Sequence, residues 1–251
     1  MGLVSSISKE AKVSALLLFV PLLITVILLF PKHEEYIATG DIVPVEELGV
    51  SGSVYFTYVN LGVTQNIYEK LTIQYSYDEI EFIPLDSYEH ENYIYQLEEM
   101  EFSKDEVVSN AVHLPIFEQS QNSNELLYNK MSNILENSSS YAGDSFGLML
   151  TIGLYEEMYK KDFSKNGSYI IAGTGTINPD YSIGEVGAIR HKLLTAEQNN
   201  VDVFFIPDNK DSYSGQSNFE EALEIVKEEK LSFQVVPVAK LDDAISYLEN
   251  S

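Results

Sequence analysis

Alternating strand and helix patterns in the last third of the chain constrain the fold most strongly. Each strand-like segment is short, apolar and rich in β-branched or aromatic residues, and each precedes a segment with the spacing of an amphipathic helix. The predicted strands cover residues 168–172, 201–206 and 231–238, and the predicted helices cover 189–198, 217–230 and 241–249. Such alternation predicts an α/β fold with a mixed sheet, in which helical crossovers join parallel strands. The order of the strands is not predicted.

The first half of the chain has less regular patterns. Residues 54–61 and 79–83 are predicted strands, with a short predicted helix at 66–75 between them. Residues 85–101 are acidic and aromatic without a clean period, so we expect an irregular or weakly helical segment there. A capping box at 103–106 then predicts the start of a helix. A further predicted helix has one apolar face, formed by Leu126, Leu127, Met131, Ile134 and Leu135.

A serine between two glycines is the first candidate for chemistry. The motif Gly143-Asp144-Ser145-Phe146-Gly147 joins a polar segment to an apolar run, residues 148–159, that has helical spacing. We therefore expect Ser145 in the first turn of this helix. The N–H groups of a first turn lack partners within the helix, so they could stabilise an oxyanion formed when the serine attacks a carbonyl.

A lysine on a later predicted helix is the candidate activator of this serine. The helical neighbours of Lys192 are all apolar: Ile189, Leu193 and Ala196. Its amine is therefore expected in a setting that disfavours the charged form, and a lysine with a pKa of roughly 7–8 can accept a serine proton near neutral pH. Ser145 as nucleophile and Lys192 as general base would form a dyad. Thr174, at a predicted strand end, is placed to hold the amine.

The N-terminal segment is a predicted membrane anchor. Residues 13–31 carry no charge and are mostly apolar, which approaches the roughly 20 residues needed to cross a bilayer. The run is longer than the apolar region of a secretory signal peptide, so we expect it to stay uncleaved. Two lysines precede the segment and two glutamates soon follow it. This charge bias predicts a single-pass protein of the cell membrane, with residues 1–12 in the cytoplasm and the rest of the chain outside.

The charge and composition of the chain exclude several partners. There are 39 acidic against 15 basic residues, and the resulting net charge of -24 repels nucleic-acid phosphates. We therefore expect no nucleic-acid binding. The chain has no cysteine, and His33, His90 and His113 have no metal-ligand spacing. Neither a complete dinucleotide-binding loop nor a P-loop occurs, so we expect neither a metal nor a cofactor.

The order and spacing of these motifs resemble the proteolytic domain of Lon proteases. The resemblance is carried by Gly143–Gly147, Ile171–Ile177, Gly184–Glu197, Val203–Pro207 and Val235–Leu248. The chain looks most like the membrane-anchored, ATPase-free Lon-like proteases of bacteria. The resemblance implies the ribosomal protein S5 domain 2-like fold for residues 102–251, preceded by an extracytoplasmic section at 32–101.

The resemblance also implies a function. It assigns Ser145 as the nucleophile, Lys192 as the base and Thr174 as the support of the lysine. Gly143 and Asp144, beside the serine, are our candidate supporting positions. The implied activity is that of an ATP-independent serine endopeptidase. Without an ATPase, its protein or peptide substrates would be exposed loops, chain ends or unfolded chains. Lon-type domains commonly form hexamers, so the resemblance also implies a homo-oligomer.

The chain departs from the Lon pattern at several positions. Asp144 and Phe146 replace the proline and alanine that are common beside the serine, and Ala188 replaces the second glycine before the lysine helix. A carboxylate near Lys192 keeps the lysine protonated, so we expect Asp144 to reduce the activity of the resting enzyme. Phe146 either narrows the substrate groove or, as we favour, is a core residue. Residues 32–101 are too short and wrongly patterned for the PDZ domain of many relatives.

Two other functions stay open. The serine motif also fits the nucleophile elbow of α/β-hydrolases, which would make the chain an esterase; that fold needs a strand before the serine and a histidine well after it. The stretch before Ser145 is polar, and the only downstream histidine, His191, is in the helix of Lys192. The other alternative is a catalytically silent Lon-like scaffold that binds membrane proteins, its chemistry lost through the changes at 144, 146 and 188.

Overall fold

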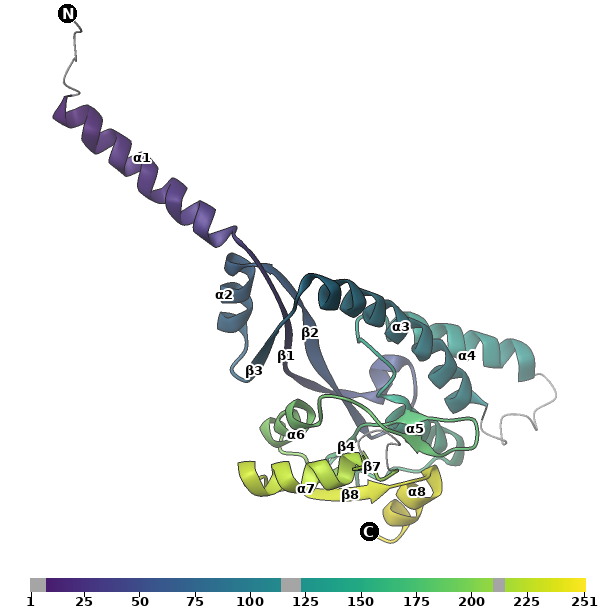
Figure 1. Ribbon diagram of the computed structural model, residues 1–251. Coiled ribbons are helices and arrows are strands. Elements are labelled where there is room, and N and C mark those ends of the chain that lie inside the picture. The colour runs from purple at the N-terminus through teal and green to yellow at the C-terminus, as the bar shows by residue number, and fades with distance from the viewer. Residues whose placement is uncertain (1–7, 114–122, 210–214) are drawn as a thin grey trace, which may run out of the picture.

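The computed structural model describes residues 8–113, 123–209 and 215–251, and these fold around one large mixed sheet (Figure 1). The strands, in spatial order, are β3 (Ile80–Pro84), β1 (Pro31–Pro44), β2 (Tyr55–Asn66), β4 (Ile171–Gly173), β7 (Val203–Pro207) and β8 (Gln234–Val238). A separate two-stranded sheet contains β5 (Thr176–Ile177) and β6 (Ile183–Gly184). The predicted α/β class with a mixed sheet is confirmed.

The C-terminal strands are parallel, as predicted. β4 pairs with β7, and β7 pairs with β8, both in parallel register. The helices of this part are α6 (Ile189–Gln198), α7 (Asn218–Glu229) and α8 (Leu241–Glu249). The bounds of these strands and helices agree with the predicted bounds to within three residues. Hydrophobic periodicity was informative here because each of these elements buries an apolar face.

The N-terminal strands belong to the same sheet. β1 lies between β2 and β3 and is antiparallel to both. β2 then pairs in parallel with β4 through Tyr55 and Phe56, which joins the two halves of the chain. β2, β3 and α2 (Ile67–Ser76) occupy the predicted segments, whereas β1 and the short 3-10 helix η1 (Val45–Leu48) were not predicted.

The segment after β3 is a long helix; of the two expectations for 85–101, irregular or weakly helical, the irregular one is wrong. Helix α3 runs from Ser87 to Val112. Asp86 caps its N-terminus by accepting the N–H of Glu89, and the Glu89 carboxylate accepts the N–H of Asp86 in return. This upstream capping box, rather than the one at residue 103, starts the helix. The predicted domain boundary after residue 101 therefore lies within α3, and the next helix, α4 (Ser123–Asn137), follows it.

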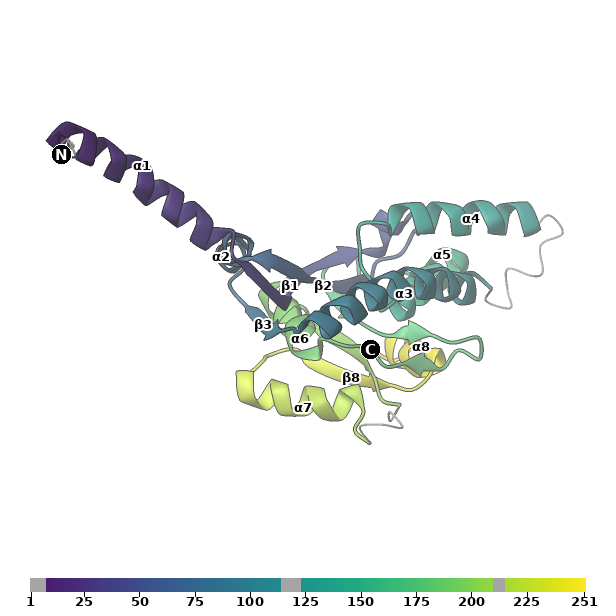
Figure 2. The same cartoon turned by 45° about the horizontal axis from the view of Figure 1, so that its top comes forward.

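Helix α5 (Gly147–Tyr159) is at the centre of the core. Its fully buried large side chains are Leu148, Met149, Leu150, Ile152 and Leu154. They pack with α3, α4, α8 and one face of the central strands, whereas α6 and α7 pack on the opposite face. Figure 2 shows α3, α4 and α5 on one side of the strands and α7 on the other. The central strands are buried on both faces, as expected for parallel strands covered by helices.

A buried carboxylate connects α5 to two loops. Glu156 is fully buried, and its carboxylate accepts three hydrogen bonds. The donors are the N–H of Ser53 at 2.6 Å, the hydroxyl of Ser53 at 2.5 Å and the N–H of Phe163 at 2.8 Å. Burial raises the pKa of the Glu156 carboxyl, and these hydrogen bonds partly offset the rise. Glu156 therefore supplies the acceptor that these loop groups would otherwise find in water.

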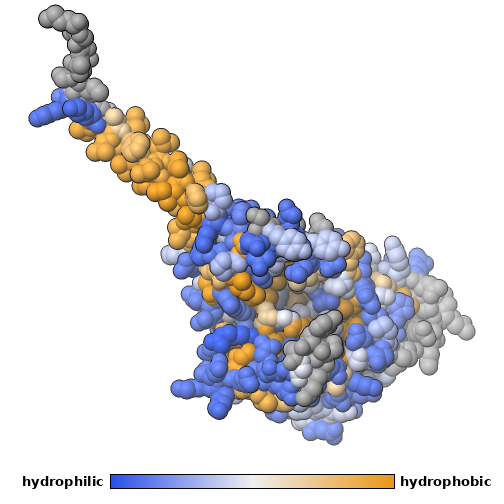
Figure 3. Space-filling view, viewed as in Figure 1, coloured by the Kyte–Doolittle hydropathy of each residue, from blue (hydrophilic) through white to orange (hydrophobic). Residues whose placement is uncertain are grey.

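Helix α1 (Lys9–Leu28) projects from the folded body and carries an apolar surface (Figure 3). Its large apolar side chains from Val13 to Ile27 are 45–74% exposed. The helix ends before residue 31, where β1 begins, so the predicted anchor segment 13–31 is helical for most of its length. In the part of the chain that the structure describes, no helix is sufficiently long and apolar to qualify as a membrane span.

Candidate active site

Ser145 lies just before α5, so the prediction that it is in the first helical turn is wrong. The helix begins at Gly147, whose N–H donates to the carbonyl of Asp144 at 3.1 Å. The N–H of Leu148 donates to the carbonyl of Gly175 at 2.9 Å. Because these two first-turn donors already have protein acceptors, they do not provide the oxyanion site that the sequence predicted. An oxyanion at Ser145 needs other donors.

Short hydrogen bonds hold Ser145 against the segment that follows β4. Its carbonyl accepts the N–H of Gly175 at 2.8 Å and the hydroxyl of Thr174 at 3.2 Å. The N–H of Thr174 in turn donates to the carbonyl of Phe205 on β7 at 3.0 Å. Gly175 has a φ of +151°, and a Cβ there would lie 2.6 Å from the side chain of Ile183. Only glycine fits this close approach, which attaches the serine loop to the rigid central strands.

Lys192 reaches the same segment from α6. Its side chain is buried, with only 3% of the residue exposed, and its Nζ donates to the Thr174 hydroxyl oxygen at 3.0 Å. Its helical neighbours Ile189, Leu193 and Ala196 belong to the core cluster beneath α6 and α7, which confirms the predicted apolar setting. The Thr174 hydroxyl therefore accepts from Lys192 and donates to the backbone of Ser145. The structure brings the three predicted residues together.

Burial gives Lys192 the ionisation of a base. Desolvation lowers the pKa of its amine from 10.5 to about 7, and the negative charge of Asp144 acts in the opposite direction. At neutral pH a large fraction of the amine is therefore uncharged and able to accept a proton. The predicted direction of the Asp144 effect on the lysine is confirmed. Its consequence for activity is a separate prediction.

One pocket of about 340 Å³ contains both candidate groups. Ser145 and Lys192 line it, together with Gly143 and Asp144. Its other described walls come from β1, β2, α3 and the loop that precedes α6. The volume lies within the range of small-molecule and peptide side-chain sites. A hydroxyl and a buried amine therefore share a cavity that a substrate segment can enter.

Helix α3 supplies a wall of the pocket that sequence reasoning missed. Tyr93, Gln96 and Met100 line the cavity at spacings of three and four residues, which places them on one helix face. They belong to the segment 85–101, which was expected to be irregular or weakly helical. The Asp86–Glu89 capping box and this spacing are the signals that could have revealed them, but the exposed Tyr88 and Tyr95 of the same stretch obscured the period.

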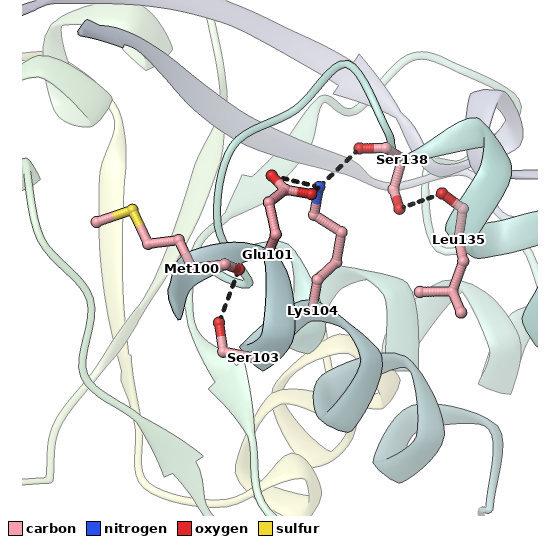
Figure 4. Close-up of polar contacts among 6 residues, drawn as sticks. All are labelled: Met100, Glu101, Ser103, Lys104, Leu135 and Ser138. Atoms are coloured by element: carbon pink, nitrogen blue, oxygen red, sulfur yellow. Dashed lines mark hydrogen bonds and ion pairs between the residues drawn. The ribbon is translucent and has the colours of Figure 1, made fainter. Parts of the chain in front are cut away.

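A second buried lysine attaches the serine loop to α3 (Figure 4). Lys104 is 3% exposed, and its Nζ lies 2.9 and 3.1 Å from the two carboxylate oxygens of Glu101. The same Nζ donates to the carbonyl of Ser138 at 3.2 Å. The Ser138 hydroxyl donates to the carbonyl of Leu135 in α4. The start of the loop that carries Ser145 is therefore held by both long helices.

Loss of the Lys104 contact is expected to destabilise the fold. Lys104→Met removes the donor of a buried carbonyl, so the free energy of unfolding should fall by about 1–3 kcal/mol. Urea denaturation at pH 7 measures this change. Lys161→Met is the matched control because it removes an exposed ion pair with Glu249, which is worth less than about 1 kcal/mol. Equal effects of the two substitutions would show that the contact with Ser138 contributes nothing.

Two departures from the Lon pattern have structural explanations. Phe146 is buried, and its ring centroid lies 5.8 Å from that of Phe56. The interpretation of Phe146 as a core residue is therefore confirmed. Ala188 has a left-handed conformation, φ 59°, at the N-cap of α6. This conformation costs a residue other than glycine roughly 1–2 kcal/mol, which explains why a glycine suits the position.

The site contains the groups that acyl transfer by a serine requires. A hydroxyl and an amine with a pKa of about 7 line one pocket, and a threonine hydroxyl orients the amine. His191, which the esterase alternative needs, is not among the described residues that line this pocket. Comparison with known proteins returns no match, either to a protein-family model or to a curated protein.

Proposed function

We propose that this chain is an ATP-independent serine endopeptidase of the Lon-like type, whose C-terminal part has the ribosomal protein S5 domain 2-like fold. The observation that carries the proposal is the buried amine of Lys192, bonded to Thr174, in the pocket that Ser145 lines. A lysine buried among apolar residues without a carboxylate hydrogen-bonded to it in the described structure is costly for stability. Such a cost is typical of a functional site.

The proposed reaction uses one proton acceptor twice. The Ser145 hydroxyl oxygen attacks the scissile carbonyl while its proton passes to the uncharged amine of Lys192. The C–N bond then breaks, the leaving amine takes that proton, and an acyl-enzyme remains. Lys192 next accepts a proton from water, whose oxygen attacks the ester, and then returns that proton to the Ser145 oxygen as the ester C–O bond breaks. Thr174 positions the amine, and the N–H of Ser145 is our candidate donor to the oxyanion.

The location and assembly of the enzyme are further parts of the proposal. We propose that residues 13–31 anchor the protein in the cell membrane with the catalytic part outside. The exposed apolar side chains of α1, and the continuation of the apolar run past its end through Leu29 and Phe30, support this. The substrates are then unfolded or exposed protein segments near the membrane. By resemblance to Lon-type domains, we propose a homo-oligomer, with a hexamer as the expected form.

A peptidyl β-lactone tests the proposed nucleophile. Attack by a serine opens the lactone ring and leaves a stable ester, which peptide mapping by mass spectrometry locates. We expect the ester on Ser145, and less of it as the pH falls below about 7, where Lys192 becomes protonated. We also expect the untreated protein to degrade unfolded casein without ATP. A protein that neither forms the ester nor cleaves casein would be the silent scaffold instead.

Removal of the Asp144 charge is expected to extend activity to lower pH. Asp144 raises the pKa of Lys192, so Asp144→Asn lowers that pKa and leaves more free amine below pH 7. We expect kcat/KM at pH 6 to rise about 3- to 10-fold. Asp242→Asn, an exposed change outside the described lining of the pocket, is the control. An unchanged pH profile for Asp144→Asn would contradict a regulatory effect of this carboxylate.

A further inference from the structure

The pocket beside Ser145 has an apolar wall and an acidic wall. Ile37, Val59 and Leu61, from β1 and β2, provide aliphatic surface. The acidic side chains that line it are Glu35, Asp144 and Glu185. Among its described lining residues only Lys192 is basic, and burial leaves about half of that amine uncharged at pH 7. Such a cavity is negatively charged and offers apolar contacts at the same time.

Strand geometry separates Glu35 from its neighbouring glutamate. Successive residues of a strand point to opposite faces. Glu34 lies on one face, where it forms ion pairs with Lys32 and Lys70. Burial acts to raise the pKa of the Glu34 carboxyl, but the two lysines outweigh it and the pKa is lowered. Glu35 lies on the other face, where it lines the pocket with Tyr93. The cations of this region therefore neutralise Glu34 and not Glu35.

The surroundings of Glu35 favour binding of a positively charged group from another molecule. Burial, together with the negative charge of Glu81, raises the pKa of the Glu35 carboxyl, and a hydrogen bond with Tyr93 only partly opposes the rise. A carboxylate that is partly desolvated next to another carboxylate is stabilised strongly by an approaching positive charge. The aliphatic residues around it suit the hydrocarbon part of a lysine or arginine side chain.

We propose that this pocket selects substrates with a lysine or arginine close to the scissile bond, and that Glu35 is the specificity-determining residue. The inference rests on the proposed endopeptidase function, because it assigns the substrate class of the same site. The strongly acidic chain, with its net charge of -24, also attracts basic segments over longer distances. That general attraction is sensitive to salt, whereas a contact with Glu35 is local.

Paired peptides test the preference directly. Two fluorogenic peptides differ only in one residue beside the scissile bond, lysine in one and norleucine in the other. We expect the ratio of their kcat/KM values to favour lysine at 150 mM salt, and Glu35→Gln to lower that ratio at least tenfold. Glu35→Asp should retain part of the preference. Glu224→Gln, the same charge change at an exposed position of α7, should leave the ratio unchanged. An equal ratio in wild type and Glu35→Gln would overturn the proposal.

A binding experiment separates this inference from the proposed chemistry. Ser145→Ala retains the pocket but cannot form an acyl-enzyme, so the affinity of the two labelled peptides can be measured by fluorescence anisotropy. We expect the lysine peptide to bind more tightly, and the difference to disappear when Glu35→Gln is added. Selective binding without any cleavage by the wild type would contradict the endopeptidase function but support a binding site for basic side chains. Cleavage with no preference in either experiment would sink the Glu35 assignment alone.

Discussion

Replacing Lys192 with methionine is expected to lower kcat/KM for peptide hydrolysis by at least about 10³-fold, and Ser145→Ala should have a similar effect. Methionine removes the proton acceptor but fills the apolar space under α6. The measurement is initial-rate cleavage of an unfolded protein or a peptide at pH 8, where the wild-type amine is mostly uncharged. Arg190→Met, two residues before Lys192 on the same helix and exposed, is the control that should retain full activity.

The same Lys192→Met substitution is expected to stabilise the fold. The pKa of the lysine is 10.5 when unfolded and about 7 when folded. Between these values the unfolded chain binds more protons, so the stability of the wild type rises with pH through this window, and the full cost of burial is present below about pH 7. Methionine removes this cost, which should raise the free energy of unfolding at pH 7 by roughly 1–4 kcal/mol.

Lys192→Met is expected to lower the activity but raise the stability, so the two effects can be told apart from simple unfolding. Inactive protein with a higher midpoint in urea cannot have lost its activity through unfolding. Loss of activity together with loss of stability would instead indicate a structural role for the amine. Full activity in Lys192→Met, or in Ser145→Ala, would remove the proposed dyad.

Replacing Glu156 with alanine is expected to lower the free energy of unfolding by about 3–5 kcal/mol. The carboxylate is fully buried and accepts hydrogen bonds from Ser53 and Phe163. Its removal leaves several donors without an acceptor and also creates a cavity, and both effects are costly. Chemical denaturation monitored by circular dichroism measures the change. A change in the slope of the denaturation curve (the m-value) without a change in its midpoint would show altered unfolding cooperativity instead.

Glu157 offers a matched control for this prediction. It is the next residue of α5, but its side chain is 28% exposed and pairs with Lys130 at 2.8 Å. Because both side chains of this pair are partly exposed and water can take the place of the carboxylate, Glu157→Ala should cost no more than about 1 kcal/mol. Similar losses at Glu156 and Glu157 would mean that the buried hydrogen bonds contribute little beyond the helix itself.

The elements that were predicted correctly carry their signal within a few residues. β7, for example, is a continuous apolar run, and α7 begins at Asn218, just after Ser217, whose side chain caps the helix together with Glu220. Such features depend on local periodicity and capping, so they can be read without knowledge of the fold. The segment of β1 contains two prolines, a glycine and several charges, and it is a strand because β2 and β3 pair with it on both sides. Pairing with distant segments leaves no local pattern to detect.

The sequence by itself determined which side chains could do chemistry: a serine between glycines, a lysine with apolar helical neighbours and a threonine at a strand end. Only the tertiary structure decided that the lysine amine bonds to Thr174 and that Ser145 precedes α5. It also decided that α3 and β1 enclose the pocket. The physical reason is that burial and desolvation depend on residues distant in the chain. Those residues lower the pKa of Lys192 from 10.5 to about 7, and no local motif encodes them.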